Sequence, residues 1–264
     1  MALVLSPIIA RRNGFDVVPL PTDRGGDAFV QAVERQKPDI VFATPSHQFP
    51  TGTLMPLPTR IELLRLAEEL DFYIIEDDSC HEYRYGTGPV PSLQSLDTGN
   101  RVVYLGNFSK TLTPALRVAF AVLPPELLER HLERGPAIPS VNTHIQDALA
   151  RFIADESLDR HVRRMVAGNR ERHDRLLECL ESSMGGAVEL SGVHSGMHFF
   201  ATVRNGMAQE DLIASARGNG ANVYGTRRFW FDSQADEGSL MIGFSAIALD
   251  DIEPGVQALA RAWV

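Results

Sequence analysis

Lysine and cysteine are both scarce in this sequence. Of the 25 basic residues in 264, only Lys37 and Lys110 are lysines, and the others are arginines. The two cysteines, Cys80 and Cys179, are too few for a disulfide framework and lack the spacing of a Cys-x-x-Cys metal site. A reaction that needs a lysine amine therefore has only two places to occur in this chain.

Long apolar runs and an excess of positive charge are also missing. No stretch approaches the ~20 apolar residues of a membrane-spanning helix. The start, MALVLSPIIARR, lacks both the basic segment and the small-residue cleavage site of a signal peptide. The net charge of −9 has the wrong sign for a chain that tracks phosphate backbones. We therefore expect a cytoplasmic protein with no direct nucleic-acid or membrane partner.

The first half of the chain alternates short β-branched apolar runs with amphipathic segments. This alternation is typical of parallel strands joined by crossover helices, and it predicts a mostly parallel sheet. The expected strands are 15–20, 39–43, 72–75, 102–105 and 117–123, and the expected helices are 27–36 and 59–70.

The second half changes character. Residues 141–183 have a helical pattern, and the remainder mixes short apolar strands with two further helices. The predicted strands are 188–190, 198–203, 222–224 and 240–244, and the predicted helices are 209–217 and 251–262. The expected organisation is a large α/β part over residues 1–135, a connecting helical segment over 136–165 and a smaller α+β domain over 166–264.

Three loops follow the ends of predicted parallel strands, where ligands bind in open α/β sheets: residues 45–52, 77–85 and 106–114. The third loop contains Lys110, which has no acidic residue within five positions on either side. Burial of such an amine would favour its neutral, nucleophilic form. The alternative is an ordinary solvated lysine. Lys37, which precedes Pro38 at the end of a polar helix, is interpreted as a surface residue.

The other candidates lie near the same strand ends. Asp77 follows the apolar run FYIIE, and its carboxylate can hold a proton on a heterocyclic nitrogen; the alternative is a helix cap or a solvated loop residue. Asp78 should point the opposite way if strand geometry persists. Ser109 and Arg117 offer a hydroxyl and a guanidinium, which suit a phosphate group.

The three blocks TPSHQFPTG, IIEDDSCHEYRYG and VVYLGNFSKTLTPALRVAFAVLP resemble the aminotransferase-like domain of MocR-type regulators. These domains belong to the fold type I proteins that bind pyridoxal 5'-phosphate (PLP), within the class I/II aminotransferase family. The resemblance implies that Lys110 forms an internal aldimine with PLP. It also implies that Asp77 pairs with the pyridine nitrogen and that Arg228 binds a substrate or effector carboxylate. The remaining cofactor-binding candidates are Ser109, Arg117, Asn107, His47 and Ser79.

The sequence departs from that pattern at several positions. Ser79 stands where the family usually has a tyrosine that bonds the phenolic oxygen of the cofactor, and Asn107 stands where a serine or threonine is usual. Phe49 stands where aminotransferase relatives have an asparagine and MocR-type domains often have an aromatic residue, and Met241 stands where some aminotransferase relatives have an arginine. No phosphate-binding glycine turn or ring-stacking aromatic residue is visible before Phe15. We therefore expect a cofactor domain truncated at its amino end, without the regulators' winged helix.

Three functions remain open at this point. The first is a PLP-dependent aminotransferase that exchanges the lysine-bound cofactor with an amine or amino acid. The alternative is a non-catalytic PLP- and amine-sensing effector domain of a MocR-type regulator, and the third possibility is a truncated copy with impaired cofactor binding.

A metal site formed by His47, His81 and Glu82 around Asp77 lacks the tight ligand spacing of known motifs. The resemblance also implies a homodimer.

Overall fold

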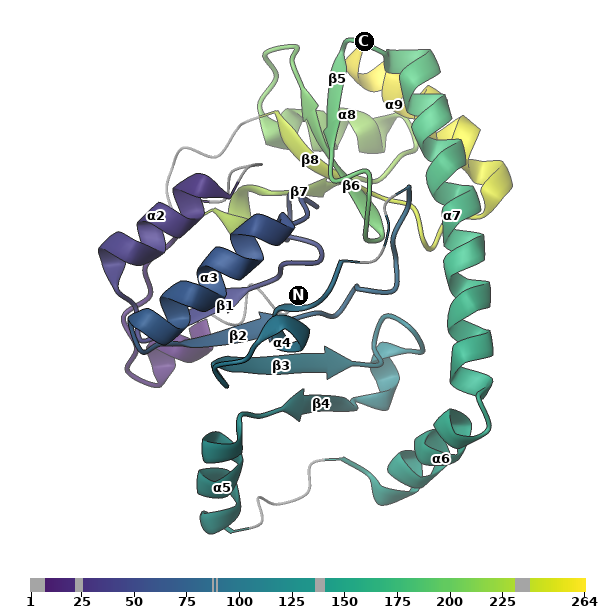
Figure 1. Ribbon diagram of the computed structural model, residues 1–264. Coiled ribbons are helices and arrows are strands. Elements are labelled where there is room, and N and C mark those ends of the chain that lie inside the picture. Colours follow the sequence, from purple (N-terminus) through teal and green to yellow (C-terminus); the bar gives the residue numbers. More distant parts are fainter. Residues whose placement is uncertain (1–7, 22–25, 87, 89, 136–140, 231–237) are drawn as a thin grey trace. The chain divides into compact units, whose positions relative to one another are not determined.

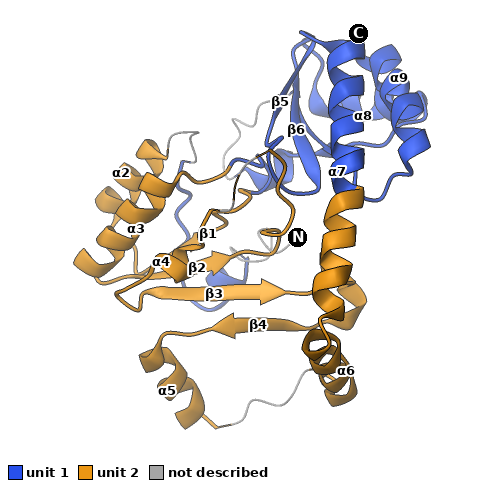
Figure 2. Cartoon of the chain, turned by 45° about the vertical axis from the view of Figure 1, so that its right-hand side comes forward, with its two compact units in different colours: residues 1–21, 49–53, 169–264 blue, residues 22–48, 54–168 orange. Residues whose placement is uncertain are grey.

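The computed structural model describes residues 8–21, 26–86, 88, 90–135, 141–230 and 238–264. The chain divides into two compact units, which Figure 2 shows in blue (unit 1) and orange (unit 2). Unit 1 comprises Met1–Pro21, Phe49–Thr53 and Asn169–Val264, and unit 2 comprises Thr22–Gln48 and Leu54–Gly168. Each unit contains a four-stranded sheet of its own.

The sheet of unit 2 is the predicted, mostly parallel one. Its strands are β1 (Ile40–Ala43), β2 (Tyr73–Asp77), β3 (Val102–Asn107) and β4 (Ala119–Val122), in the spatial order β1-β2-β3-β4. The first three strands run parallel, and β4 runs antiparallel to β3. Because β1, β2 and β3 point the same way, the loops that follow them leave from one edge of the sheet.

Helices of unit 2 connect and flank these strands. In α3, which the sequence predicted over residues 59–70, Leu63, Leu66 and Ala67 are buried. Figures 1 and 2 both show α2 and α3 side by side over one face of the sheet. The short α4 and the helix α5 were not predicted from the sequence. The helices are α2 (Asp27–Gln36), α3 (Leu57–Glu69), α4 (Leu93–Leu96), α5 (Pro125–Glu133), α6 (Thr143–Ala154) and the first part of α7 (Ser157–Met184), with a 3-10 turn η1 (Pro114–Leu116).

The part of unit 2 formed by β4, α5 and α6 is little buried. All four residues of β4 are exposed, including Phe120 at 46% and Val122 at 43%, and neither α5 nor α6 buries a side chain. The core of unit 2 therefore lies around β1, β2 and the start of β3, where Val41, Ile74 and Val102 are almost inaccessible to solvent.

Unit 1 is built on an antiparallel sheet with the order β5-β6-β8-β7. Its core includes Phe199, Leu240 and Phe244. Trp263 is also buried, and its indole N–H donates to the carbonyl oxygen of Leu212 at 3.1 Å. The elements are the end of α7, β5 (Val188–Ser191), β6 (His198–Val203), α8 (Gln209–Gly218), β7 (Tyr224–Gly225), η2 (Arg227–Phe229), β8 (Ser239–Gly243), η3 (Leu249–Asp251) and α9 (Ile252–Trp263).

The strand predicted at residues 15–20 is wrong. The backbone there pairs with no strand among the described residues, and Phe15 and Val18 are about half exposed. A β-branched run becomes a strand only when a neighbouring backbone accepts its hydrogen bonds. Among the described helices, none is both long and apolar enough to cross a bilayer.

Candidate functional site

The candidate site lies in unit 2, where β1, β2 and β3 end. The registers pair Ala43 with Glu76 and Asp77 with Leu105, so the loops after the three strands start from neighbouring positions. Two of the predicted loops, at 77–85 and 106–114, belong wholly to this unit. The predicted loop at 45–52 is divided, because residues 49–53 belong to unit 1.

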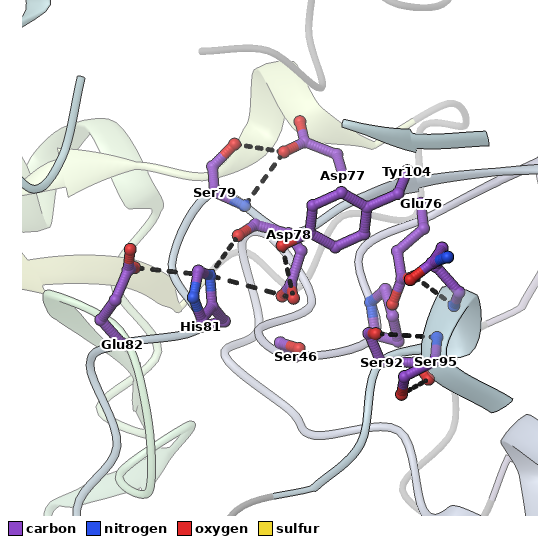
Figure 3. A network of polar contacts seen from close by, with 12 residues as sticks. Ser46, Glu76, Asp77, Asp78, Ser79, His81, Glu82, Ser92, Ser95 and Tyr104 are labelled. Carbon is purple, nitrogen blue, oxygen red and sulfur yellow. Dashed lines mark hydrogen bonds and ion pairs between the residues drawn. The ribbon is translucent and has the colours of Figure 1, made fainter. Parts of the chain in front are cut away.

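The two consecutive acids at the end of β2, Asp77 and Asp78, point in different directions, as their strand positions predicted (Figure 3). The carboxylate of Asp77 faces Ser79, whose hydroxyl and backbone N–H both donate to Asp77 Oδ1, the N–H at 3.2 Å. Asp78 is buried, and its Oδ2 accepts a bond of 3.3 Å from the Tyr104 hydroxyl. The carboxylate of Asp77 therefore lies on the side of Ser79, and that of Asp78 on the side of Tyr104.

Asn107 links the Asp77 loop to the lysine loop. Its side-chain amide donates to Ser79 Oγ at 2.6 Å, and its carbonyl oxygen accepts the backbone N–H of Ser109 at 2.9 Å. Four of the predicted site residues thus form one hydrogen-bonded chain, from Ser109 through Asn107 and Ser79 to Asp77. Because this chain crosses from β3 to β2, it fixes the two loops relative to each other.

Lys110 is exposed, which agrees with the solvated alternative and not with a buried amine. The inward position of the loop is taken by the next residue, Thr111, which is 3% exposed. The loop backbone is nevertheless held, because the hydroxyl of Tyr83 donates to the carbonyl oxygen of Lys110 at 2.9 Å. His161 of α7 lies 2.8 Å from the carbonyl oxygen of Thr111 through Nε2. The amine is accordingly accessible on a fixed backbone.

The pKa of the Cys80 thiol depends on the charged residues around this edge. Burial is the main cause that raises its pKa to about 11, the ammonium of Lys110 opposes that rise, and the carboxylates of Glu82, Asp77 and Asp78 add to it. Lys110 and Asp77 therefore both lie within electrostatic range of one sulfur atom. Burial also raises the pKa of Tyr83, to about 12.

The remaining candidates of unit 2 are less closely tied to this chain of bonds. Arg117 is exposed and adopts a left-handed backbone with φ of 55° directly after η1. His47 is buried in the loop after β1, and its backbone N–H donates to the carbonyl oxygen of Thr44 at 3.3 Å. The hydrogen bonds that join Asp77 to the lysine loop include neither residue, so their assignment to the cofactor stays a prediction.

Arg228, the predicted carboxylate-binding residue, belongs to unit 1. Its guanidinium lies 4.7 Å from the centroid of the Phe229 ring, and that ring packs edge-on against Phe49 at 4.7 Å between centroids. The neighbouring Arg227 instead forms an ion pair with Glu210 at 2.8 Å. Arg228 is thus held by an aromatic face and stays exposed to solvent.

Arg60 is a supporting residue that sequence reasoning missed. Its side chain is fully buried, and it donates to the carbonyl oxygens of Pro45 at 2.7 Å, Pro91 at 2.9 Å and Met55 at 3.1 Å. Burial lowers its pKa, and the nearby carboxylate of Glu76 partly opposes that shift. The sequence contained one indication of this buried charge, because Glu76 is an acidic residue inside an apolar strand.

A shallow cavity of about 300 Å³ adjoins the same edge on the side of Asp78. It combines apolar walls with carboxylates. The residues that line it are Asp78, His81, Glu82, Gly106, Asn107, Phe108, Thr111, Phe120, Leu158, Asp159 and Val162. Within the described part of the chain, no group of three or more His, Cys, Asp or Glu side chains is arranged to hold a metal ion.

Comparison with known proteins supplies the family context for this geometry. The family model described as aminotransferase class I and II matches residues 7–258. An uncharacterised HTH-type transcriptional regulator of Bacillus subtilis, YhdI, is 39% identical over 95% of this chain and 53% of its own length. The probable rhizopine catabolism regulatory protein MocR of Rhizobium meliloti is 34% identical over 95% of this chain and 51% of its own length. The chain thus spans about half the length of these relatives.

The fold has solved counterparts as well. The crystal structure of LysN, an α-aminoadipate aminotransferase from Thermus thermophilus, matches with a TM-score of 0.84 and 28% identity. The match covers 96% of this chain and 66% of that one, and LysN is complexed there with N-(5'-phosphopyridoxyl)-L-leucine. The predicted α/β fold, with a mostly parallel sheet and a second smaller sheet, is confirmed by this likeness.

Proposed function

Because the chain belongs to the class I and II aminotransferase family, we propose that it binds PLP at Lys110 and senses an amino compound there. In this role it acts as an effector domain of the MocR type. The observation that carries the proposal is the chain of hydrogen bonds that joins Asp77 to the lysine loop through Ser79 and Asn107. It sets an open carboxylate oxygen and an accessible amine at one sheet edge.

The residues present fit the cofactor in chemical type. Oδ2 of Asp77 accepts no hydrogen bond from the residues that the structure describes, so it is open to the N–H of a pyridinium ring. The exposed amine of Lys110 can reach an aldehyde. Ser109 and Arg117 offer a hydroxyl and a guanidinium for phosphate. When bound, PLP supplies an electrophilic carbon and a ring that withdraws electrons from it.

Sensing is favoured over turnover by two observations. Both regulators described above match this chain over nearly all its length. In addition, Ser79 is too short to reach the phenolic oxygen that a tyrosine would contact, and its hydroxyl is already committed to Asp77. A ligand amine that displaces Lys110 would change the charge and contacts of the lysine loop, which is the kind of local change an effector domain transmits.

Transamination is the second candidate. It is favoured by the presence of both groups that the reaction needs, the amine of Lys110 and the carboxylate of Asp77, and by the likeness to an α-aminoadipate aminotransferase. After displacement, the lysine amine would carry a proton between the substrate carbon and the cofactor. Sustained conversion of an amino acid and a keto acid would support this function, whereas a spectral change without product supports sensing.

Cofactor binding is tested by reduction trapping. After incubation with PLP and borohydride, mass spectrometry should find the added pyridoxyl group on the peptide that contains Lys110. Lys110→Ala should abolish both the adduct and the visible absorption band. Lys37→Arg is the matched control, since it changes the only other lysine and should leave both signals intact. An adduct at Lys37, or none at all, would refute the proposal and favour a copy that cannot hold the cofactor.

Ligand recognition is tested at two adjacent arginines. Arg228→Ala should weaken the spectral response to amino acids about tenfold or more, because a charged hydrogen-bond partner of the carboxylate is lost. Arg227→Ala removes a neighbouring charge that already pairs with Glu210, and it should change the response little. Equal effects of the two substitutions would remove Arg228 from the proposed ligand site.

A further inference from the structure

We propose that Asn107 and Ser79 are positioning residues that act through Asp77. This inference deepens the proposed function and rests on it. The observation is the hydrogen-bonded chain that starts at the backbone N–H of Ser109 and ends at Asp77 Oδ1. Its members are part-buried, and its steps join the ends of β2 and β3.

The direction of every bond in this chain follows from one backbone group. The N–H of Ser109 can only donate, so the atom of Asn107 that faces it must be the carbonyl oxygen. The amide nitrogen of Asn107 therefore faces Ser79 Oγ and donates to it. A hydroxyl has a single proton, and with a donor on one side Ser79 directs that proton to Asp77.

The consequence is an asymmetric carboxylate. Oδ1 of Asp77 receives the hydroxyl and the backbone N–H of Ser79, whereas Oδ2 receives no bond from the described residues. The carboxylate is thereby held in one rotation with its open oxygen directed away from Ser79. Ser79 thus contacts Asp77 at the position where the resemblance predicts a tyrosine, and Asn107 directs the hydroxyl of Ser79 toward that carboxylate.

Asn107 has a second task that Ser79 lacks. By accepting the N–H of Ser109, it caps the turn that leads directly into Lys110. Loss of Ser79 should therefore disturb only the acceptor for the ring nitrogen, whereas loss of Asn107 should disturb both that acceptor and the lysine loop. This difference distinguishes a hydrogen-bond relay, by which we mean the bonded chain from Ser109 through Asn107 and Ser79 to Asp77, from a set of unrelated contacts.

Three substitutions test the relay in the PLP-loaded chain. Ser79→Ala should weaken PLP binding about three- to tenfold, the range expected for one lost hydrogen bond. It should also move the pH midpoint of the visible band upward, because a less firmly protonated ring withdraws less charge from the lysine-bound nitrogen. Asn107→Asp keeps an acceptor for Ser109 but cannot donate to Ser79, so it should shift the midpoint without changing the rate of reduction trapping at Lys110. Asn107→Ala should change both.

Ser92→Ala is the matched control, because it removes a serine hydroxyl of the same unit that accepts the N–H of Ser95 at the start of α4. It should leave binding and midpoint unchanged. A midpoint in Ser79→Ala equal to that of the unsubstituted chain, or an equal shift in Ser92→Ala, would overturn the relay while leaving PLP binding intact. Absence of any band that depends on Lys110 would instead overturn the proposed function.

A measurement without PLP tests the bond geometry independently. In hydrogen exchange followed by NMR, the amide proton of Ser109 should exchange faster in Asn107→Ala, because its acceptor is gone. The same proton should remain protected in Asn107→Asp and in Ser79→Ala. Equal exchange rates in the unsubstituted chain and Asn107→Ala would refute the relay whatever the cofactor does.

Discussion

Arg60 offers the sharpest test of how the candidate site is supported. The proposed change is Arg60→Met, which keeps an unbranched side chain but removes all the donors. In the structure these donors hold the carbonyl oxygens of Pro45, Met55 and Pro91, and the side chain is fully buried. Both ends of the loop between β1 and α3, and the segment before α4, would therefore lose a common partner.

The expected loss of stability follows from the burial of each bond. The bond to Pro45 is buried, and an orphaned acceptor there costs about 1–3 kcal/mol. The bonds to Met55 and Pro91 are only part-buried, so water can replace the guanidinium at roughly 0.5–1 kcal/mol each. Because burial of the charge is itself unfavourable and lowers the pKa of Arg60, its removal returns part of this loss. We expect a net decrease of about 3 kcal/mol in the free energy of unfolding.

Chemical denaturation followed by circular dichroism measures this quantity. The midpoint of thermal unfolding should fall by roughly 6–12 °C, given about 2–4 °C per kcal/mol for a chain of this size. Arg65→Met is the control on the same helix, because Arg65 is exposed and pairs with Glu62 and Glu69. Its effect should be far smaller, since water screens ion pairs at the surface. Similar losses in both variants would show that the carbonyl contacts of Arg60 do not carry the stability assigned to them.

Two further predictions concern pH and backbone strain. Burial raises the pKa of Glu76 in the folded chain above its ordinary value of 4.5. Between pH 4.5 and this raised pKa, the folded chain therefore binds more protons than the unfolded chain. The contribution of Glu76 to the free energy of unfolding therefore falls as the pH rises through that window. Denaturation at several pH values should show this decrease with pH in the unsubstituted chain and not in Glu76→Gln. The same dependence on pH in both chains would contradict the prediction. Gly26 has φ of +81°, and a Cβ there would collide with Thr59 Oγ1, so Gly26→Ala should destabilise the fold by more than about 2 kcal/mol. Gly86→Ala, with φ of +74° and open space, should show only the backbone part of about 1–2 kcal/mol, and equal thermal shifts would refute the clash.

Local sequence patterns predicted most of the elements. The helix α2 and the strand β6 have the predicted bounds, and the strands β1, β2, β3 and β8 begin and end within two residues of prediction. Periodicity works there because each element buries one face or one continuous apolar run. The short α4 lacks such a signal, since it is set by Ser92 and the carboxylate of Glu76, which accepts two N–H groups at its start. The segment 15–20 has the sequence pattern of a strand, but no neighbouring strand pairs with it among the described residues.

The sequence identified candidate residues for the site but could not predict how they are bonded to one another. Strand ends and the resemblance pointed to Asp77, Ser79, Asn107 and Ser109, which the structure joins by hydrogen bonds. The sequence left open whether Lys110 is buried or exposed, because a loop without acids has the same pattern whether the lysine faces inward or outward. Arg60 went unnoticed because one buried arginine is indistinguishable in sequence from many exposed ones.

The sequence by itself determined that Lys110 is the one lysine at a strand end, that the net charge is negative, and that parallel strands alternate with helices. These properties depend on composition and short-range order, which can be counted along the chain. Only the tertiary structure decided which oxygen of Asp77 is held, how Asn107 is oriented and what Arg60 contacts. Asn107 and Ser79 lie 28 positions apart, and Arg60 and Pro91 lie 31 positions apart, so these bonds exist only once the fold brings the segments together.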